Sequence, residues 1–468
     1  MPEQKPPSDR RTVATRTDTF RARACVALND PVMRGALLKA TRTALAKRQE
    51  TLSSLDFDRL RQHARSIRLA VVDRLSHYVR LFSSQAVSRG VHVHECDTSE
   101  SANRTILQIL RGYGAARIVK SKSMVTEEIG LYKRLRDASF EVVETDLGEY
   151  IVSLAGERPS HITAPAIHKT RSQVGRLFHD VLGAPYSDNP HELAAMARQL
   201  LRVAFLEAHA GITGANFGLA DSGGIVLFTN EGNGRMCTVL PPLHIAVMSP
   251  EKIIPSIEDL DVFMKLLPAS ATGQDLTTYL SIIAGVGRDP AAHADGDMHI
   301  VVVDNGRSRI AHTDYRDILT CIRCGACMNV CPVYTSVGGH AYNSTYVGPM
   351  GIVLSILLFG MDAHHELTEA CTLCGACDEV CPVAIPLSRL IGRLRSERIN
   401  QGLIPTSESL GMKFLGRAFQ SPMAYRFSQG ATTSLLNQLA PRHSLPVILR
   451  RLPKPLGLPL HRIFRDEK

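Results

Sequence analysis

Two stretches of this 468-residue chain share one pattern: CIRCGACMNVCPVY begins at Cys321, and CTLCGACDEVCPVA begins at Cys371. Each sets four cysteines and a proline in the spacing C-x2-C-x2-C-x3-C-P, and the second copy starts fifty residues after the first. Eight of the eleven cysteines of the chain lie in these two copies. We call Cys321 to Cys331 the first run and Cys371 to Cys381 the second run.

The spacing is that of bacterial ferredoxins, whose thiolates bind [4Fe–4S] clusters. Three cysteines in a tight loop can each bind one iron, and Gly325 and Gly375 allow the backbone to curl around the cluster. In two-cluster ferredoxins the fourth cysteine of each run ligates the other cluster. The pattern therefore predicts two [4Fe–4S] clusters with crossed ligands, which are Cys321, Cys324, Cys327 and Cys381 for one, and Cys371, Cys374, Cys377 and Cys331 for the other.

Structural zinc is the alternative for closely spaced cysteines, but zinc ribbons bind through C-x2-C knuckles, four ligands at a time. Between the runs, MGIVLSILLFGM (350–361) is apolar and too short to span a bilayer, so it predicts a buried helix. A second helix is predicted after the second run, over PLSRLIGRLRSERINQG. Helices around two clusters resemble the alpha-helical ferredoxin domain of succinate-dehydrogenase-type and heterodisulfide-reductase-type iron–sulfur subunits.

Residues 91–310 alternate short β-branched segments with helical ones, which predicts an α/β sheet that is at least partly parallel. The predicted helices include SESANRTILQIL and VTEEIGLYKRLRDA. The predicted strands are residues 91–96, 116–122, 140–145, 224–229, 243–248 and 298–304.

Ligand-binding loops of such sheets lie at the carboxyl ends of the strands. KSKSMVTEE (120–128) leaves a strand and begins a helix, whose N-terminus favours an anion such as the carboxylate of a small acid. The glycine-rich segment 211–235 is the second candidate, although plain turns explain such loops equally well. The predicted substrate residues are Lys120, Ser123, Asn216, Asn230, Glu231 and Arg235.

The charge is unevenly distributed, with +10 on residues 1–90, −9 on 91–410 and +8 on 411–468. Basic ends suit docking to acidic partners or an anionic membrane surface, and also helix faces that are simply solvated. Few aromatic residues and no helix-turn-helix or zinc-finger spacing argue against nucleic acid. The first residues lack the apolar core of a secretory signal, so we expect a soluble, cytoplasmic protein, at most peripheral to a membrane.

Taken together, the chain resembles the iron–sulfur subunit of the three-component lactate-utilisation complex, an L-lactate dehydrogenase of the LutABC type. The resemblance rests on stretches in one order from about residue 30 to 400, among them VKSKSMVTEE, RPSHITAPAIHK, TNEGNGR, the two runs and GGHAYNSTYVGPMG. It implies a LUD domain, similar in fold to ribose-phosphate isomerases and CoA transferases, followed by a dicluster domain. The implied boundaries are 1–90 (basic helical region), 91–310 (LUD), 311–402 (dicluster) and 403–468 (basic tail).

The resemblance also implies that the chain carries electrons while L-lactate is oxidised to pyruvate. Its implied partners are a cysteine-rich-domain subunit and a smaller LUD-domain protein, and we expect no activity from the chain alone. Three alternatives stay open: another 2-hydroxy acid as substrate, acyl transfer with Glu231 as the nucleophile on a CoA-transferase-like fold, and a scaffold whose clusters only brace the fold.

Overall fold

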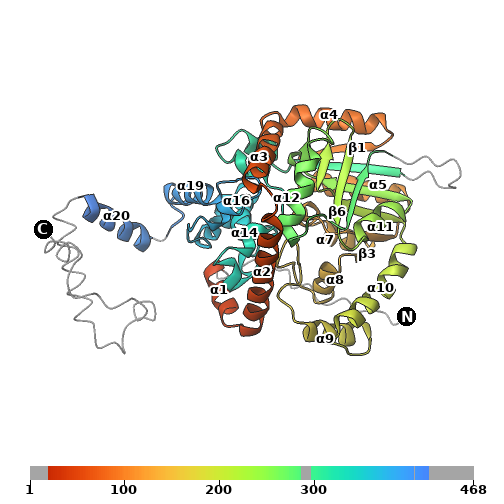
Figure 1. The fold of residues 1–468 in the computed structure, drawn as a ribbon, viewed down its shortest axis with the longest axis horizontal. Helices are drawn as coiled ribbons and strands as arrows, with labels where there is room; N and C mark the ends of the chain where they lie inside the picture. Colours follow the sequence, from red (N-terminus) through yellow and green to blue (C-terminus); the bar gives the residue numbers. More distant parts are fainter. Residues whose placement is uncertain (1–18, 286–296, 405, 421–468) are drawn as a thin grey trace. The chain divides into compact units, whose positions relative to one another are not determined.

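The computed structural model describes residues 19–285, 297–404 and 406–420 of the chain (Figure 1). The chain forms two compact units, residues 1–395 and 396–468. The described residues of the smaller unit are the end of α19 (Leu387–Asn400) and α20 (Thr406–Gln420). Most of the predicted basic tail, 403–468, therefore lies outside the described residues.

A six-stranded sheet forms the centre of the larger unit, and all of its strands are parallel. This confirms the predicted α/β class with a parallel sheet. In spatial order the strands are β1 (His92–Cys96), β10 (Asp297–Val303), β7 (Leu243–Met248), β4 (Ala210–Gly214), β2 (Arg117–Lys120) and β3 (Glu141–Glu144).

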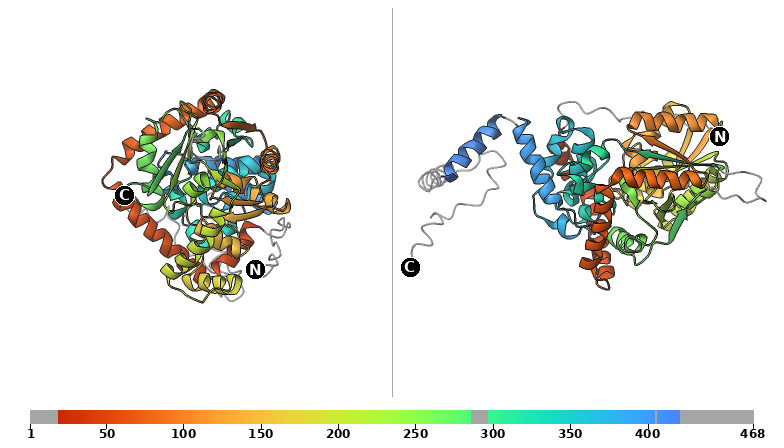
Figure 2. Two further views of the ribbon diagram at one scale, coloured as in Figure 1. Left: turned by 90° about the vertical axis from the view of Figure 1, so that its right-hand side faces the viewer. Right: turned by 90° about the horizontal axis from the view of Figure 1, so that it is seen from above.

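Side chains alternate across this sheet, as the pleat requires. On β10, Val301 and Val303 pack with α5 (Ser99–Gly112) and α7 (Leu131–Asp137), whereas Ile300 and Val302 belong to the core on the other face. Both faces are therefore covered (Figure 2). Burial on both faces explains why these strands are continuous apolar runs in the sequence.

The second sheet lies within the core on the Ile300 face, and it has the order β8-β5-β6-β9. β5 pairs parallel with β8, and β6 pairs antiparallel with β5 and β9. The four strands are β5 (Phe217–Leu219), β6 (Gly224–Thr229), β8 (Ile253–Ile254) and β9 (Tyr279–Ile283).

The glycine-rich segment 211–235 is not the loop that the sequence suggests, because it contains β4, β5, β6 and the start of α11 (Asn233–Val239). A Cβ at Gly211 would lie 1.9 Å from the carbonyl oxygen of Cys237, so glycine here permits α11 to pack against β4. The predicted helix 125–138 is also divided, into α6 (Met124–Glu128) and α7, at Gly130 with a φ of 64°.

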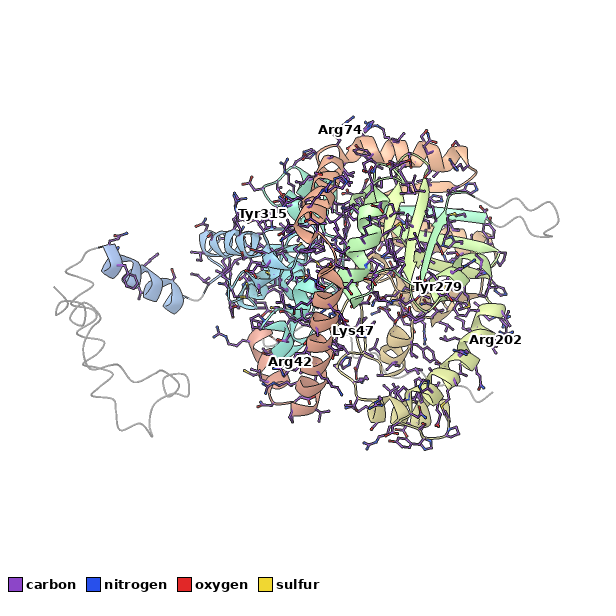
Figure 3. All side chains as sticks on the ribbon, viewed as in Figure 1. Arg42, Lys47, Arg74, Arg202, Tyr279 and Tyr315 are labelled. Carbon is purple, nitrogen blue, oxygen red and sulfur yellow. The ribbon has the colours of Figure 1, made fainter. Side chains whose placement is uncertain are left out.

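The N-terminal helices pack onto the same unit. α2 begins where Asp30-Pro31 predicts, since the Asp30 carboxylate accepts the Met33 N–H at 2.9 Å. α2 also passes α12 so closely that a Cβ at Gly273 would lie 2.4 Å from the Cβ of Lys47, which Figure 3 labels. The helices of this part and of the LUD region are α1 (Phe20–Leu28), α2 (Pro31–Leu52), α3 (Phe57–Asp73), α4 (Leu75–Ser88), α8 (Leu147–Leu154), α9 (Arg171–Leu182), α10 (Pro190–Leu206) and α12 (Leu260–Thr272).

Short helices carry the two cysteine runs. The apolar segment between the runs forms α16 (Gly348–Phe359), whose first nine residues are buried, as predicted for a core helix. The other helices are α13 (Arg307–Ala311), α14 (Ala326–Asn329), α15 (Tyr334–Val337), α17 (Met361–His364) and α18 (Ala376–Glu379), with 3-10 turns at η1 (Pro250–Lys252), η2 (Arg316–Thr320), η3 (His340–Tyr342) and η4 (His365–Glu369).

One hydrophobic cluster joins the sheets to the helices of the cysteine region, because Phe217 of β5, Met328 of α14 and Ile352 of α16 all belong to it. The domain boundaries at residues 90, 310 and 402 stay predictions. None of the helices in the described ranges combines the length and apolar character that crossing a bilayer requires.

Candidate functional site

The two cysteine runs repeat in backbone conformation as well as in spacing. The third residue of each run, Arg323 or Leu373, lies in the left-handed region with a φ of 61° or 58°. Two residues later, Gly325 and Gly375 both have a φ of 80°. A bulky residue with positive φ is costly, so the same strain at the same place in both runs indicates a functional constraint on the loop.

Backbone amides donate hydrogen bonds to cysteine sulfurs at the first and the fourth position of each run. Such N–H groups favour the thiolate form that iron requires, and they tune the potential of an iron–sulfur centre. The four bonds are Arg323 N to Cys321 Sγ at 3.4 Å, Tyr334 N to Cys331 Sγ at 3.5 Å, Leu373 N to Cys371 Sγ at 3.3 Å, and Ile385 N to Cys381 Sγ at 3.3 Å.

The fourth cysteine of each run has its electrostatic neighbours in the other run. Burial raises the pKa of Cys331, and Cys371 and Cys374 raise it further. Burial likewise raises the pKa of Cys381 to about 11, with Cys321 as a further cause. Each fourth cysteine therefore lies close enough to cysteines of the other run for their charges to affect its pKa.

This donor set fits iron–sulfur ligation. Soft thiolates, tight loops and amide donors to sulfur are what such a centre requires. Burial raises the pKa of the Cys324 thiol to about 12, and Cys321 and Cys381 add to the effect. Binding a cluster would release the thiol protons, since only the deprotonated sulfur is a ligand.

The first run is tied to the sheet by a chain of buried charges. Arg323 donates to Glu251 Oε1 at 3.2 Å, and its guanidinium lies 5.2 Å from the ring centroid of Tyr346. Glu251 Oε2 lies 2.9 Å from Arg307 Nε, and Arg307 Nη2 lies 2.5 Å from Glu128 Oε2. Although burial alone would raise it, Arg307 and Arg323 lower the pKa of Glu251 to about 2. The first run thus begins in a buried ionic network that links it to α6 and to the turn after β7.

The second run is more open to solvent than the first. Leu373 is 44% exposed, whereas Arg323, at the same position of the first run, is 8% exposed. Cys374 is exposed as well, whereas Cys324 is buried. The second run therefore brings Cys374 to the protein surface, while Cys377 and Cys381 stay buried.

The charges beside the two runs also have opposite sign. The cation Arg323 lies next to Cys321, which raises the pKa of the arginine against the effect of burial. Beside the second run, Asp378 Oδ1 lies 3.5 Å from Cys377 Sγ, and the carboxylate adds to the effect of burial in raising the pKa of that thiol.

Arginines of α2 and α3 donate to backbone carbonyls around both runs. Part of the positive charge of residues 1–90 is therefore used inside the protein, and is not left for a partner. The bonds are Arg48 to Val380 O at 2.9 Å, Arg61 to Asp378 O at 2.8 Å, Arg65 to Ala384 O, and Arg68 to Leu319 O at 3.0 Å and Thr320 O at 3.2 Å.

A cavity of about 280 Å³ lies at the carboxyl ends of β2 and β4. Residues 121–125 and 214–216, which follow or end these strands, form part of its wall. β2 pairs with β3 on one side and with β4 on the other, so the strand order reverses here. Ligands of open α/β sheets bind at such positions. The first run reaches the same cavity through Arg323.

Two lysines line this cavity, the half-buried Lys122 and Lys252, which is 6% exposed. Among the described residues, neither ammonium group has a hydrogen bond or an ion pair within 4 Å. Burial lowers the pKa of Lys122 although Asp146 opposes the shift. Burial and the nearby Arg323 lower the pKa of Lys252 to about 7.

Four of the residues predicted to bind substrate line the cavity, namely Ser123, Asn216, Asn230 and Glu231. All four have hydrogen bonds within the protein as well. Ser123 caps α6 by accepting the Thr126 N–H, and Asn216 Oδ1 accepts the Phe228 N–H at 3.0 Å.

The structure places the other two, Lys120 and Arg235, outside the cavity wall. Lys120 is still within the sheet, in register with Glu144 of β3, and its Nζ lies 2.9 Å from the Glu144 carboxylate. Arg235 is exposed on α11. Lys122, two residues beyond the end of β2, is the lysine of this segment that reaches the cavity.

Three cavity or loop residues were not singled out from the sequence. Lys252 lies in the turn η1, which follows the carboxyl end of the predicted strand β7. That position could have marked it as a candidate ligand-binding residue. Arg323 occupies one of the variable positions between the cysteines of the first run, and the motif assigns no role to those positions. His161 is buried, and its Nε2 lies 3.2 Å from Oδ1 of Asn329, which stands between the third and fourth cysteines of the first run. The segment around His161 carries no periodicity that would indicate this contact.

Comparison with known proteins agrees with this arrangement. Residues 79–310 match the LUD domain, and residues 317–385 match the 4Fe-4S dicluster domain. Lactate utilization protein B of Bacillus velezensis is 44% identical over 413 residues, which cover 88% of this chain and 87% of that protein. This chain belongs to the lactate utilization protein B family.

Two further relatives show the same extent of likeness. Lactate utilization protein B of Bacillus subtilis (strain 168) is 43% identical over 413 residues, which cover 88% of this chain and 86% of that protein. The uncharacterized electron transport protein YkgF of Escherichia coli (strain K12) is 44% identical over 414 residues, covering 88% and 87%. The family predicted from the sequence is therefore confirmed, with its LUD domain ahead of its dicluster domain.

Proposed function

We propose that this chain is the electron-transfer iron–sulfur subunit of a complex that oxidises L-lactate to pyruvate. Membership of a family whose members are named lactate utilization protein B supports the pathway, and the dicluster domain supports the role. A [4Fe–4S] cluster, when bound, transfers one electron at a time. Two clusters together match the two electrons that each lactate releases.

The observation that carries the proposal is the exchange of the fourth cysteines between the two runs. Cys331 has Cys371 and Cys374 as its neighbours, and Cys381 has Cys321. This supports two clusters with crossed ligands. We assign Cys321, Cys324, Cys327 and Cys381 to the first cluster, and Cys371, Cys374, Cys377 and Cys331 to the second.

The chain's own residues hold and tune these sites. Amides of Arg323 and Leu373 donate to the first sulfur of each run, which stabilises negative charge on the sulfur. The buried network through Glu251 keeps Arg323 in place beside the first site. The exposed edge at Leu373 and Cys374 gives the second site the shorter route to a partner.

The proposed partners are the cysteine-rich-domain subunit and the smaller LUD-domain subunit, and we place the assembly in the cytoplasm. The parallel sheet of the LUD region supports a fold similar to those of ribose-phosphate isomerases and CoA transferases, which also stays a proposal.

The test is anaerobic electron paramagnetic resonance of the purified chain, before and after L-lactate is added, with and without the two partners. We expect two [4Fe–4S] signals on chemical reduction, and reduction by lactate only when the partners are present. Two intact clusters that lactate reduces under neither condition would contradict the proposed role.

A further inference from the structure

The cavity beside the first run has the position of a ligand site. It lies where the order of the parallel strands reverses, and the loops after β2 and β4 meet there. A Cβ at Gly214 would lie 2.7 Å from Ser123 Oγ, so glycine is what allows these loops to close one side of the cavity. At about 280 Å³ the cavity is near the lower end of the size range of small-molecule sites, so a small acid fits in it.

The cavity has an excess of positive charge, which favours an anion. Its wall carries three cations and two acids, namely Lys122, Lys252, Arg323, Asp146 and Glu231. Lys252 is 6% exposed and lines the cavity, yet its ammonium group has no hydrogen bond or ion pair with any residue in the described ranges. Lys122 lines the same cavity in the same unpaired condition. Lys120 shows the usual arrangement instead, since its buried ammonium lies 2.9 Å from the carboxylate of Glu144. Burial without a partner disfavours the charged form of a lysine, and a bound anion would stabilise that form.

The cavity also adjoins the first cluster site. Arg323 lines the cavity, and its backbone N–H donates to Cys321 Sγ at 3.4 Å. A molecule in the cavity is therefore separated from a cluster ligand by a single residue. No other residue of either run lines the cavity, so the contact is specific to the first run.

We infer that this cavity binds a small carboxylate of the 2-hydroxy or 2-oxo acid class, with Lys122 and Lys252 holding the carboxylate beside the first run. The choice of acid rests on the proposed function, whereas the anion site rests on the cavity and its unpaired lysines. The LUD domain is then the place where the substrate or product acid meets the electron-transfer subunit.

The experiment is a set of calorimetric titrations of the cluster-loaded full-length chain, under anaerobic conditions, with L-lactate and with pyruvate. Lactamide, which lacks the negative charge, is the matched ligand control. Lys122→Met and Lys252→Met remove one cation each. Lys265→Met is the matched protein control, because Lys265 is exposed on α12 and paired with Asp261 at 2.7 Å. Iron content and circular dichroism establish that each variant is folded and loaded.

We expect each cavity variant to weaken binding of the acids by at least about tenfold, as for the loss of a hydrogen bond to a charged group. Lys265→Met should bind normally, and lactamide should bind weakly to every form. The titrations are repeated on the assembled complex in case the cavity closes only there.

Acid binding that is unchanged in both cavity variants would overturn the inference, and so would equal binding of lactamide and lactate, or no binding to the chain and to the complex. These outcomes are distinct from failure of the proposed function. If the inference alone is wrong, lactate still reduces the clusters in a complex that contains Lys252→Met. If the proposed function is wrong, lactate reduces no cluster in the wild-type complex.

Discussion

The first and the second cysteine run have the same backbone conformation but differ in their surroundings. Arg323 and Leu373 have nearly the same φ, yet one is buried in an ionic network and the other is 44% exposed. The first run adjoins the cavity of the LUD region, and the second comes close to the surface. A repeated motif thus sets how the cysteines are presented, while the residues around each copy determine what that copy can exchange electrons with.

The largest effect is expected from replacing the fourth cysteine of either run with serine. Cys331→Ser should remove the cluster of the second run, and Cys381→Ser should remove that of the first, because each thiol has its neighbours in the opposite run. Paramagnetic resonance and iron content measure the loss.

Cys324→Ser and Cys374→Ser identify which signal belongs to which run, and Cys25→Ser, at an exposed lone cysteine, is the control. If Cys331→Ser instead abolished the signal that Cys324→Ser abolishes, the crossed assignment would be wrong.

The second effect concerns the ionic network of the first run. Glu251→Gln leaves buried Arg307 and Arg323 without their shared carboxylate, and should lower the free energy of unfolding by about 3–5 kcal/mol. Glu100→Gln breaks an exposed pair with Arg134 and should cost less than about 1 kcal/mol. Urea unfolding of both variants measures the difference, and equal costs would show that the network adds no rigidity to the first run.

The same network predicts a pH dependence. The pKa of Glu251 is lowered to about 2, so its contribution to stability is complete above the unfolded value of about 4.3. That contribution decreases as the pH falls from about 4.3 toward 2. The unfolding midpoints of the wild type and of Glu251→Gln should therefore converge in acid; a constant gap down to pH 2 would contradict the assigned cause.

The third effect is on redox potential. Arg323→Leu gives the first run the side chain that the second run has at the same position, Leu373. Because the change removes a buried cation, it should lower the reduction potential of the first cluster. The expected shift is on the order of 50–100 mV, equivalent to one nearby charge in a medium of intermediate dielectric. Leu373→Arg should raise the potential of the second cluster by less, because that position is exposed to solvent. Redox titration monitored by paramagnetic resonance measures both, and shifts of equal size would mean that burial is not what distinguishes the runs.

The smallest effect is expected at Glu231, which lines the cavity but is exposed. If the LUD region takes part in lactate oxidation and performs no acyl transfer, Glu231→Gln should leave lactate turnover of the complex unchanged within experimental error. Complete loss of turnover, together with a trapped acyl adduct in the wild type only, would favour acyl transfer.

The sequence predicted the cysteine runs and the buried helix α16 because spacing and unbroken apolar character are local properties. It predicted the strands β1, β2, β3, β6, β7 and β10 for the same reason, since each is rich in β-branched residues. β4 was not predicted because its glycines are typical of a turn. The need for glycine at position 211 becomes clear only from the close packing of α11 against β4.

The candidate site could be predicted only in part. Ser123 and Glu231 were found because they lie next to strand ends. Lys120 was preferred to Lys122 because the exact end of β2, on which the burial of each lysine depends, is set by pairing with β3. Lys252 and Arg323 come together from segments seventy residues apart, and that proximity exists only in three dimensions.

The arginines of α2 and α3 have a consequence for the biogenesis of the protein. Arg48 and Arg61 are translated early, yet the carbonyls that they bind, at Val380 and Asp378, are more than three hundred residues away in the chain. The ribosome must therefore complete nearly the whole polypeptide before the second run can be braced. The contacts that brace the second run are accordingly formed late in synthesis, and the cysteines of a nascent chain must stay reduced until then.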